Sequence, residues 1–475
     1  PNHESHMTTS LLSPTHQILT DATILLAPDK SYPPYLWQRA IVPANASRVG
    51  ALVTFYKTER RTQIFASLFA PDGFRGCRMA PGQMEGVVLE LWSSPAAASE
   101  GAMPGPLPAG DWRVQLDIHA IAEPLDVQVV IYAEFDEIPN AVSLTFPDDH
   151  VVKPEVGWYK GELHAHSTES DGKQPVDTVI RAALDAGLDY FSLTDHFTIS
   201  QWRKLIPHLE QPMALIRSCE VTSHHGHANL HGMKAWVNVF VDEPGWTMND
   251  AADAIHAQGG LFCVNHAFSG VLGWRTFDFD WSKADLYEIY HNLEGSNNVL
   301  QVPLWDRQLS HGHRIVGVGA IDSHDPFDGL HRLGQVVTWV YADELSERGI
   351  LAGLRRGRVY VSKGPELRFV VRNSAGTVAE MWETLPAAGG VTLEVQVKSA
   401  LPLRLFAIRD GYYLEMKQTT GAPDWQSYTI TDRPTRNTYY RIELHAAPAD
   451  DHYSAILRRD HETVLALSNP VWVAV

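Results

Sequence analysis

Short runs of alternating apolar and polar residues dominate the first third of the chain. They are rich in valine, isoleucine, leucine and aromatic residues, and turn sequences such as Pro71-Asp72-Gly73 separate them. Alternation with a period of two, in residues of this type, is typical of half-buried strands. The pattern predicts a small antiparallel β-sandwich over residues 17–146. Its expected strands cover residues 40–42, 49–56, 62–69, 86–92, 112–118 and 126–132.

Helical periodicity begins only after a polar linker at 147–154. Apolar residues then recur every three or four positions in 175–187, which begins at Pro175 and ends at Gly187. Proline suits the first turn of a helix, and glycine suits the position after its last residue. Two further segments, 248–258 and 344–356, have the same periodicity.

Seven apolar runs between these segments predict strands, and most of them end in His, Asp or Glu. Strands that alternate with helices predict an α/β fold. Here the count predicts a (β/α)7 barrel over residues 154–365, with its site at the carboxyl ends of the strands. The expected strands lie at 162–166, 189–196, 215–220, 226–230, 261–266, 285–291 and 315–324.

The last part of the chain returns to short β-rich runs. We expect a second small antiparallel β-sandwich over 366–475, with the helix at 344–356 closing the barrel against it. Neither flanking domain shows a cluster of acidic residues and histidines, which favours a role in packing or homo-oligomer formation over sugar binding. The expected strands are 367–371, 391–397, 401–409, 438–444 and 470–473.

Length and charge limit the possible partners. A chain of 475 residues is long enough for two or three domains, and it has no run of eighteen apolar residues. The net charge of −18 argues against a nucleic-acid polymer as partner, and we expect no membrane partner. Residues 1–6 resemble a cloning remnant, so 1–16 is expected to be a tag remnant with a disordered start. The stretch after Met7 lacks the pattern of a secretory signal, which predicts a cytoplasmic protein.

Histidine, rather than cysteine, indicates metal chemistry. The three cysteines are far apart, which argues against a disulfide framework and excludes a cysteine-rich zinc site. Fifteen of the twenty-three histidines lie between positions 164 and 331. The segment Glu162-Leu163-His164-Ala165-His166 places both imidazoles on one side of a strand, and Asp171 follows in a turn. The candidate metal ligands are His164, His166, Asp171, His196, Glu220, His227, His266, Asp322 and His324.

These residues occur in an ordered set of motifs that resembles the PHP (polymerase and histidinol phosphatase) superfamily of metallohydrolases. Within it the chain looks like the CehA/McbA-type hydrolases, which share the Gly226-His227-Ala228-Asn229 segment and a tail like 468–473. Ala267 and Phe197 depart from the usual motifs, and both departures bear on substrate shape. The motifs are His164-Ala165-His166 with Asp171, Thr194-Asp195-His196, Glu220, Gly226-His227-Ala228-Asn229, Asn265-His266 and Asp322-Ser323-His324.

The resemblance implies a distorted (β/α)7 barrel with a trinuclear site. The ligand sets it implies are His164, His166, Glu220 and Asp322 for one ion, Glu220, His227 and His266 for a second, and Asp171, His196 and His324 for a third. Imidazoles and carboxylates without thiolates suit zinc, manganese or iron. A carboxylate shared by two ions holds them about 3.5–4 Å apart, so that a bridging hydroxide is available near neutral pH. Such a centre suits hydrolysis of a phosphate ester.

Other residues have weaker assignments. Asp195 is expected to orient a neighbouring ligand. His291, Arg275 and Lys234 are candidates for the group that protonates the leaving group or contacts the substrate. The aromatic residues expected to line the entrance are Trp274, Phe268 and Phe197.

Three functions remain open. The first is a metal-dependent phosphoesterase that acts on small phosphate mono- or diesters. The second is hydrolysis of an aryl carbamate or carboxyl ester at the same site, which the shortage of cationic residues near the motifs keeps open. The third is a binding protein whose metal ions are structural, which predicts fully saturated ions.

Overall fold

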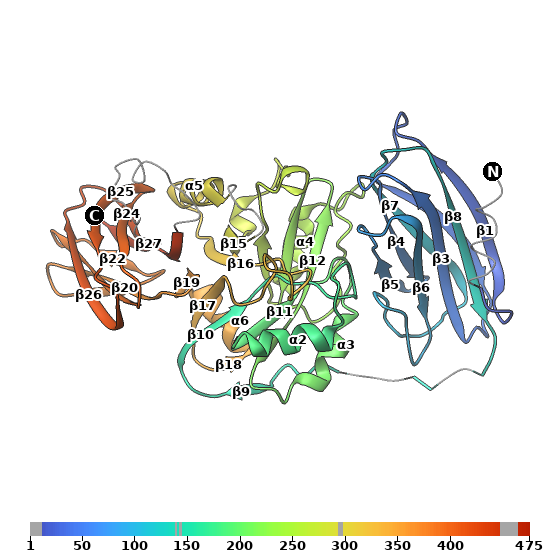
Figure 1. Ribbon diagram of the computed structural model, residues 1–475, viewed down its shortest axis with the longest axis horizontal. Helices are drawn as coiled ribbons and strands as arrows, with labels where there is room; N and C mark the ends of the chain where they lie inside the picture. Colours follow the sequence, from blue (N-terminus) through green and yellow to red (C-terminus); the bar gives the residue numbers. More distant parts are fainter. Residues whose placement is uncertain (1–11, 138–139, 142–144, 293–297, 447–463) are drawn as a thin grey trace.

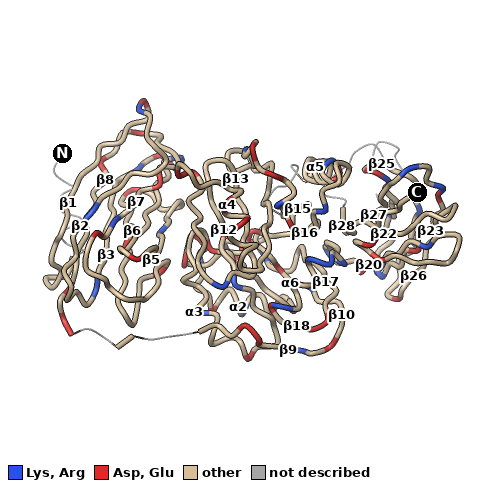
Figure 2. Tube along the Cα trace, turned by 180° about the vertical axis from the view of Figure 1, so that it is seen from behind, with Lys and Arg blue, Asp and Glu red and all other residues tan. Residues whose placement is uncertain are grey.

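The computed structural model describes residues 12–475 except 138–139, 142–144, 293–297 and 447–463 (Figure 1). Three parts follow one another along the longest axis, and the two ends of the chain lie at opposite ends of the molecule (Figure 1). Lys and Arg positions are mixed with Asp and Glu positions over all three parts (Figure 2). The predicted remnant at 1–6 and most of the predicted disordered start lie outside the described residues.

The N-terminal part consists of two antiparallel four-stranded sheets, with orders β1-β8-β3-β6 and β2-β7-β4-β5. Trp112, Val114 and Leu116 of β7 are buried between them. The pattern did not predict β1, a half-exposed strand, or β5, in which two of six residues are glycine. The strands are β1 (Gln17–Leu26), β2 (Tyr35–Val42), β3 (Arg48–Lys57), β4 (Gln63–Ala70), β5 (Gly73–Arg78), β6 (Glu85–Ser93), β7 (Gly110–Ala120) and β8 (Leu125–Glu134).

The central part contains seven strands in the order β16-β15-β14-β13-β12-β11-β10. Neighbours pair in parallel except at β12/β13 and β13/β14, where the pairing is antiparallel. On the other side of β10, the sheet continues into β17 and β19. The seven strands are β10 (Gly157–Glu162), β11 (Tyr190–Leu193), β12 (Ala214–Ser223), β13 (Gly226–His231), β14 (Leu261–Val264), β15 (Leu286–His291) and β16 (Val316–Ala320), and the two that follow are β17 (Val337–Ala342) and β19 (Val359–Ser362).

The mixed α/β architecture with flanking sheets is confirmed, but the predicted (β/α)7 barrel is not found as a closed barrel. Within the described residues no strand ladder joins β10 to β16, and one parallel bridge, Ala165 to Ser323, links the segments that follow them. A regular βα unit is also missing between β12 and β13. Only residues 224–225 connect these strands, and a parallel crossover needs a dozen residues or more, so the pair forms a hairpin.

The three helices predicted from the periodicity, α2, α4 and α6, are present, but α3 and α5 were not predicted. In α2 the buried face is Val176, Val179, Ile180 and Ala183, and Gly187 follows with φ of 67°. A reciprocal pair of hydrogen bonds between Thr247 and Asp250 caps the start of α4. Among the described residues, no helix has the length and apolarity needed to cross a bilayer. The helices are α2 (Val176–Asp185), α3 (Gln201–Leu205), α4 (Met248–Ala257), α5 (Asn298–Ser310) and α6 (Glu347–Arg356).

The C-terminal part packs the sheet β21-β20-β23-β26 against the strands β24, β25, β27, β28 and β29. Strand β28 pairs with β19, so the second group of strands is continuous with the central sheet. Asn469, which is fully buried, bonds the backbone of Gly317 and Val359. The strands are β20 (Glu366–Asn373), β21 (Val378–Glu380), β22 (Thr384–Pro386), β23 (Val391–Ser399), β24 (Leu403–Arg409), β25 (Tyr412–Gln418), β26 (Ala422–Asp432), β27 (Thr438–Ala446), β28 (Val464–Ser468) and β29 (Val471–Ala474).

Two short strands, β9 (Val151–Lys153) and β18 (Leu345–Ser346), pair with each other next to α6. Strand β9 lies inside the segment expected to be a linker. The predicted linker is therefore partly paired with the chain that leads into α6.

Candidate metal centre

The predicted ligands converge at one end of the central sheet. Because β13 runs antiparallel to β12, its start, with His227, lies at the same end as the last residues of β12. Glu220 is on β12, two residues before the partner of His227. The others follow parallel strands: His164, His166 and Asp171 come after β10, His196 after β11, His266 after β14, and Asp322 and His324 after β16. Side-chain distances of 4.0 Å or less connect all nine.

Glu220 is at the middle of this cluster and is fully buried. Its Oε2 lies 3.2 Å from His164 Nε2, 3.4 Å from His166 Nε2 and 3.0 Å from His196 Nδ1. Its Oε1 faces another pair, His227 Nδ1 at 3.3 Å and His266 Nε2 at 3.5 Å. Burial by itself would raise the pKa of Glu220, but the surrounding imidazoles, His164 and His196 above all, hold it well below its usual range.

Asp322 is a second point of contact between ligands. Its Oδ1 lies 2.9 Å from His166 Nε2 and 3.3 Å from His164 Nε2, while its Oδ2 lies 3.5 Å from His291 Nε2. The exposed fraction of its side chain is 14%. Asp322 therefore lies between the buried ligands and the solvent-facing side of the site.

The outer ligands form their own group around Asp171. Its Oδ2 lies 3.3 Å from His324 Nε2, and its Oδ1 lies 3.5 Å from His196 Nε2. Burial opposes protonation of His324, but the carboxylates of Asp171 and Asp322 outweigh it and raise the pKa of His324 to about 10. At 26%, the side chain of His324 is more exposed than those of Asp171 and Asp322, so the site opens on this side.

Glu288 contacts two of the predicted ligands, and the sequence motifs missed it. Its Oε1 lies 2.7 Å from His164 Nδ1, and its Oε2 accepts a hydrogen bond from the backbone N–H of His266 at 2.7 Å. The signal in the sequence was a carboxylate between the apolar residues Leu286, Tyr287 and Ile289 of β15, a strand in which every residue is buried. Burial of a carboxylate without a partner is costly, so such a residue calls for a nearby donor or cation.

Asp195 holds the loop that leads to Asp171 and does not face the ligand nitrogens. Its carboxylate accepts hydrogen bonds from Ser167 N at 2.8 Å, Ser167 Oγ at 2.8 Å and Ser170 Oγ at 2.7 Å. Burial raises the pKa of Asp195 to about 6 despite these bonds. These bonds connect Asp195 to the segment between His166 and Asp171.

Of the three candidates for acid or substrate contacts, the structure brings one to the ligands. His291 lies next to Asp322 and 4.0 Å from Glu288, and its side chain is 2% exposed. Arg275 instead donates to the backbone oxygens of His224 and Val271. Lys234 is exposed, and no contact links it to a ligand within the described part of the chain.

The expectation that Phe197 lines the entrance is wrong. Its ring is fully buried and stacks on Phe240 with centroids 5.5 Å apart, close to Phe65 of the N-terminal part. Trp274 is partly exposed and lies over Gly226, where a side chain would collide with it. Trp274 therefore sits beside the strand start that carries His227.

Three residues at the strand ends have left-handed backbone conformations that are unusual for residues with side chains. The φ angles are 63° at Phe197, 22° at His266 and 57° at Asp322. His266 and Asp322 are predicted ligands, and Phe197 follows one. Such strain persists only where surrounding contacts impose it, and it is common at functional sites.

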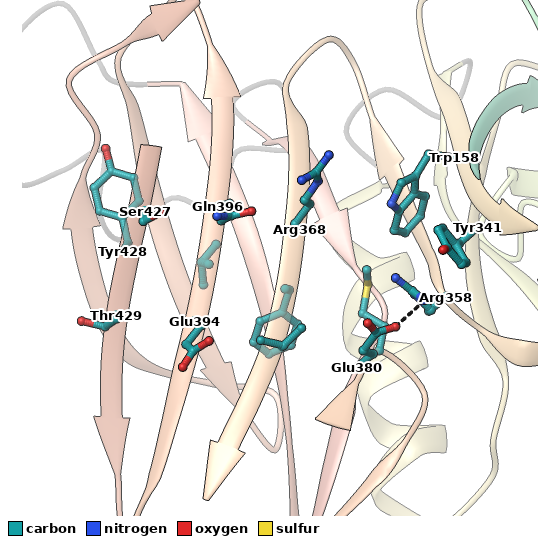
Figure 3. A pocket seen from close by; sticks show the side chains of 14 residues that line it. Trp158, Tyr341, Arg358, Arg368, Glu380, Glu394, Gln396, Ser427, Tyr428 and Thr429 are labelled. Carbon is teal, nitrogen blue, oxygen red and sulfur yellow. Dashed lines mark ion pairs between the residues drawn. The ribbon is translucent and has the colours of Figure 1, made fainter. Parts of the chain in front are cut away.

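A separate cavity of about 520 Å³ lies between the C-terminal part and the central part. Trp158, Tyr341 and Arg358 form one side of it, and Arg358 pairs with Glu380 at 2.5 Å (Figure 3). None of the predicted ligands lines this cavity. It is therefore distinct from the metal centre.

Comparisons with known proteins give distant likenesses. No family model matches the chain, and a search of curated proteins finds no match. A two-domain protein containing a predicted PHP-like metal-dependent phosphoesterase, from Bacteroides vulgatus, has TM-score 0.38 and 17% identity over 69% of this chain and 100% of its own. PsfC from Pseudomonas syringae has a TM-score of 0.30 and 16% sequence identity, and the match covers 39% of this chain and 83% of PsfC. An amidohydrolase from Chromobacterium violaceum with bound sulfate has a TM-score of 0.25 and 15% sequence identity, and the match covers 35% of this chain and 88% of the amidohydrolase. We therefore base the function on the residues of this chain.

The arrangement fits divalent metal ions. Several buried ligand atoms have no hydrogen-bond partner among the described residues, including His164 Nε2, both ring nitrogens of His166, Glu220 Oε2 and Asp322 Oδ1. Buried polar atoms are normally satisfied, and these converge on one another. Several groupings among the described residues have donor atoms close enough to share an ion. Those made of predicted ligands include His166 with Asp171, His196 and His324; His164 with Glu220 and His266; and His164 with His166 and Asp322. Nitrogen and carboxylate donors without thiolates suit zinc, manganese or iron.

Proposed function

We propose that this chain is a metal-dependent hydrolase of the PHP superfamily, of the CehA/McbA-like type, that cleaves small phosphate mono- or diesters. The observation that carries the proposal is Glu220, whose two oxygens face different sets of imidazoles. That arrangement is suited to a carboxylate shared by two ions.

Three ions would account for the ligands. His164, His166, Glu220 and Asp322 would hold one, and Glu220, His227 and His266 would hold a second. Asp171, His196 and His324 would hold a third, on the open side of the site. When bound, such ions supply hydroxide near neutral pH and neutralise charge that develops on phosphoryl oxygens.

The chain's own residues prepare the site for this chemistry. An ionised Glu288 can only accept hydrogen bonds, so Nδ1 of His164 carries the proton and Nε2 is free to bind metal. Asp195 fixes the loop that carries Asp171. His291, next to Asp322, is our candidate for proton transfer to the leaving group.

A second function is hydrolysis of an aryl carbamate or carboxyl ester. Exposed apolar side chains that follow two of the ligands in the sequence favour it. Val271 and Phe277 follow His266, and Phe327 and Leu330 follow His324. They are close to the ligands in the sequence and would offer an apolar surface to an aromatic substrate. In addition, no Lys or Arg side chain contacts a predicted ligand within the described residues, whereas phosphate esters usually meet cationic groups.

Elemental analysis combined with activity assays tests the proposal. Purified protein is expected to hold about three metal equivalents at this centre and to hydrolyse nitrophenyl phosphate mono- or diesters until a chelator is added. Asp322→Ala and His166→Ala should reduce the rate by several orders of magnitude, while His208→Ala, at a histidine that pairs with Asp177, should not. Faster cleavage of an aryl carbamate would favour the second function. A fully metallated protein without any esterase activity would contradict both and favour a binding role.

A further inference from the structure

A second group of metal-type ligands lies where the N-terminal sandwich meets the central part. Asp117 and His119 are two residues apart on β7, so both side chains project from the same face of the strand. Their neighbours Leu116 and Ile118 belong to the core of the sandwich, on the other face. The third member, His224, lies in the turn between β12 and β13.

The three side chains are close together and mostly buried. Asp117 Oδ1 lies 3.1 Å from His224 Nε2, and Asp117 Oδ2 lies 3.3 Å from His119 Nε2. The exposed fractions are 2% for the Asp117 side chain and 9% for that of His119. The two imidazoles stack with centroids 4.3 Å apart.

Two of these atoms are buried and close together but form no hydrogen bond in the described part of the chain. Asp117 Oδ2 and His119 Nε2 face each other, yet neither has a hydrogen-bond partner within the described residues. A buried polar atom without a hydrogen bond destabilises the folded state. A cation between them would satisfy both.

We propose that Asp117, His119 and His224 bind one further divalent transition-metal ion, with Zn²⁺ the best match. Zinc binds imidazole nitrogen and carboxylate oxygen at about 2.0–2.2 Å in a tetrahedron, which puts neighbouring donor atoms roughly 3.3 Å apart. Each imidazole lies at about that distance from one carboxylate oxygen, 3.1 Å from Oδ1 for His224 and 3.3 Å from Oδ2 for His119. One donor atom from each of the three residues lies within 4.8 Å of the other two. Calcium and magnesium prefer oxygen-rich sites, so two imidazoles disfavour them.

An ion here would connect two parts of the molecule. The backbone N–H of His224 donates to Asp242 Oδ2 at 2.9 Å, which fixes the turn. That turn joins β12, which carries Glu220, to β13, which begins next to His227. The site would thus attach the N-terminal sandwich to the hairpin that supplies two ligands of the main centre. The proposal does not depend on the reaction catalysed there.

Metal content of matched variants tests the proposal. His119→Gln and His224→Gln should each lower the metal content by about one equivalent relative to the wild type. His225→Gln is the control, because His225 lies in the same turn, is 62% exposed and pairs with Asp242 instead of Asp117. The difference is measured against the wild type, so it is independent of the number of ions at the main centre. Equal metal content in all four proteins would overturn the proposal.

A second measurement needs no variant in the group. Crystals of the 475-residue chain, loaded with stoichiometric Zn²⁺, are expected to show an anomalous peak at the zinc edge within bonding distance of His119 Nε2. The proposal would be overturned if the crystals showed no peak and Asp117 were hydrogen-bonded directly to the two imidazoles. The Asp322→Ala protein is expected to keep this peak, which separates a failure here from a failure of the main centre.

Discussion

The carboxylate of Glu288 lies 2.7 Å from Nδ1 of His164, while Nε2 of the same ring faces Glu220 at 3.2 Å. One imidazole is therefore held between two fully buried carboxylates. Glu288 also accepts from the backbone N–H of His266, so a single side chain orients two predicted ligands.

Replacement of Glu288 by glutamine tests this role. The amide has one acceptor oxygen in place of two, so Glu288→Gln can keep only one of the two hydrogen bonds. We expect metal affinity and kcat to fall by about 10–100-fold, as for other residues that orient metal ligands. Metal titration and steady-state kinetics measure the effect. Glu415→Gln is the control, because Glu415 is exposed whereas Glu288 is buried. Unchanged affinity and rate would mean that Glu288 does not orient His164.

Asp195→Asn should affect the outer group of ligands selectively. The amide presents a donor where the carboxylate accepted from Ser167 or Ser170, which would shift the loop that carries Asp171. The expected result is loss of about one metal equivalent with the remaining ions retained, measured by elemental analysis. Loss of every ion, or of none, would contradict the assignment of Asp195 to this loop.

Asn469 is expected to contribute to stability through three buried hydrogen bonds. Asn469→Ala would leave the N–H and C=O of Gly317 without their side-chain partner. The C=O of Val359 would lose one of its two hydrogen bonds and keep the bond from the backbone N–H of residue 469. Each unsatisfied buried group costs about 1–3 kcal/mol, so the free energy of unfolding should fall well beyond that of a surface variant. Denaturant unfolding measures the difference. Asn437→Ala, at an exposed residue that accepts one bond from Val475, is the control and should have a small effect.

His256 at the end of α4 predicts a pH-dependent contribution to stability. The hydrogen bond with Asp285, at 2.7 Å, raises the pKa of His256 above its ordinary value, with burial opposing the shift. A histidine whose pKa is higher in the folded state than in the unfolded state stabilises the folded state. Its contribution is fully present below the unfolded pKa of about 6.5 and is lost as the pH rises through the folded pKa. Unfolding of wild type and His256→Gln should therefore differ more at pH 6 than at pH 9. A difference that is equal at both, or larger at pH 9, would contradict the prediction.

Metal removal should destabilise the central part. Without cations, the carboxylates of Asp171, Glu220 and Asp322 have mainly imidazoles as partners in a buried site. Ligand that binds only the folded state stabilises it by about 2.7 kcal/mol at 100 times its Kd. Thermal unfolding of chelated protein should show a lower Tm that zinc or manganese restores. An unchanged Tm would argue against metal at the centre.

The local pattern of the chain was enough to locate most of the candidate centre. Polar residues at the ends of apolar runs, such as His196 and His266, stand out because a strand inside a core rarely ends in a histidine. Glu288 did not stand out, because its partner His164 is 124 positions away and only the fold brings them together. Asp117 and His224, separated by 107 positions on different parts of the chain, are a similar case.

The sequence by itself determined three of the five α-helices among the described residues, α2, α4 and α6, and most strands, since these depend on periodicity and turn residues within a few positions. It also determined which residue types stand at the strand ends. Tertiary structure alone decided the antiparallel direction of β13, the open ladder between β10 and β16, and the contacts of Glu288 and Asp117. These features depend on which segments, distant in the sequence, pack side by side. The packing energy comes from contacts between residues far apart in the chain, so a local sequence pattern does not reveal it.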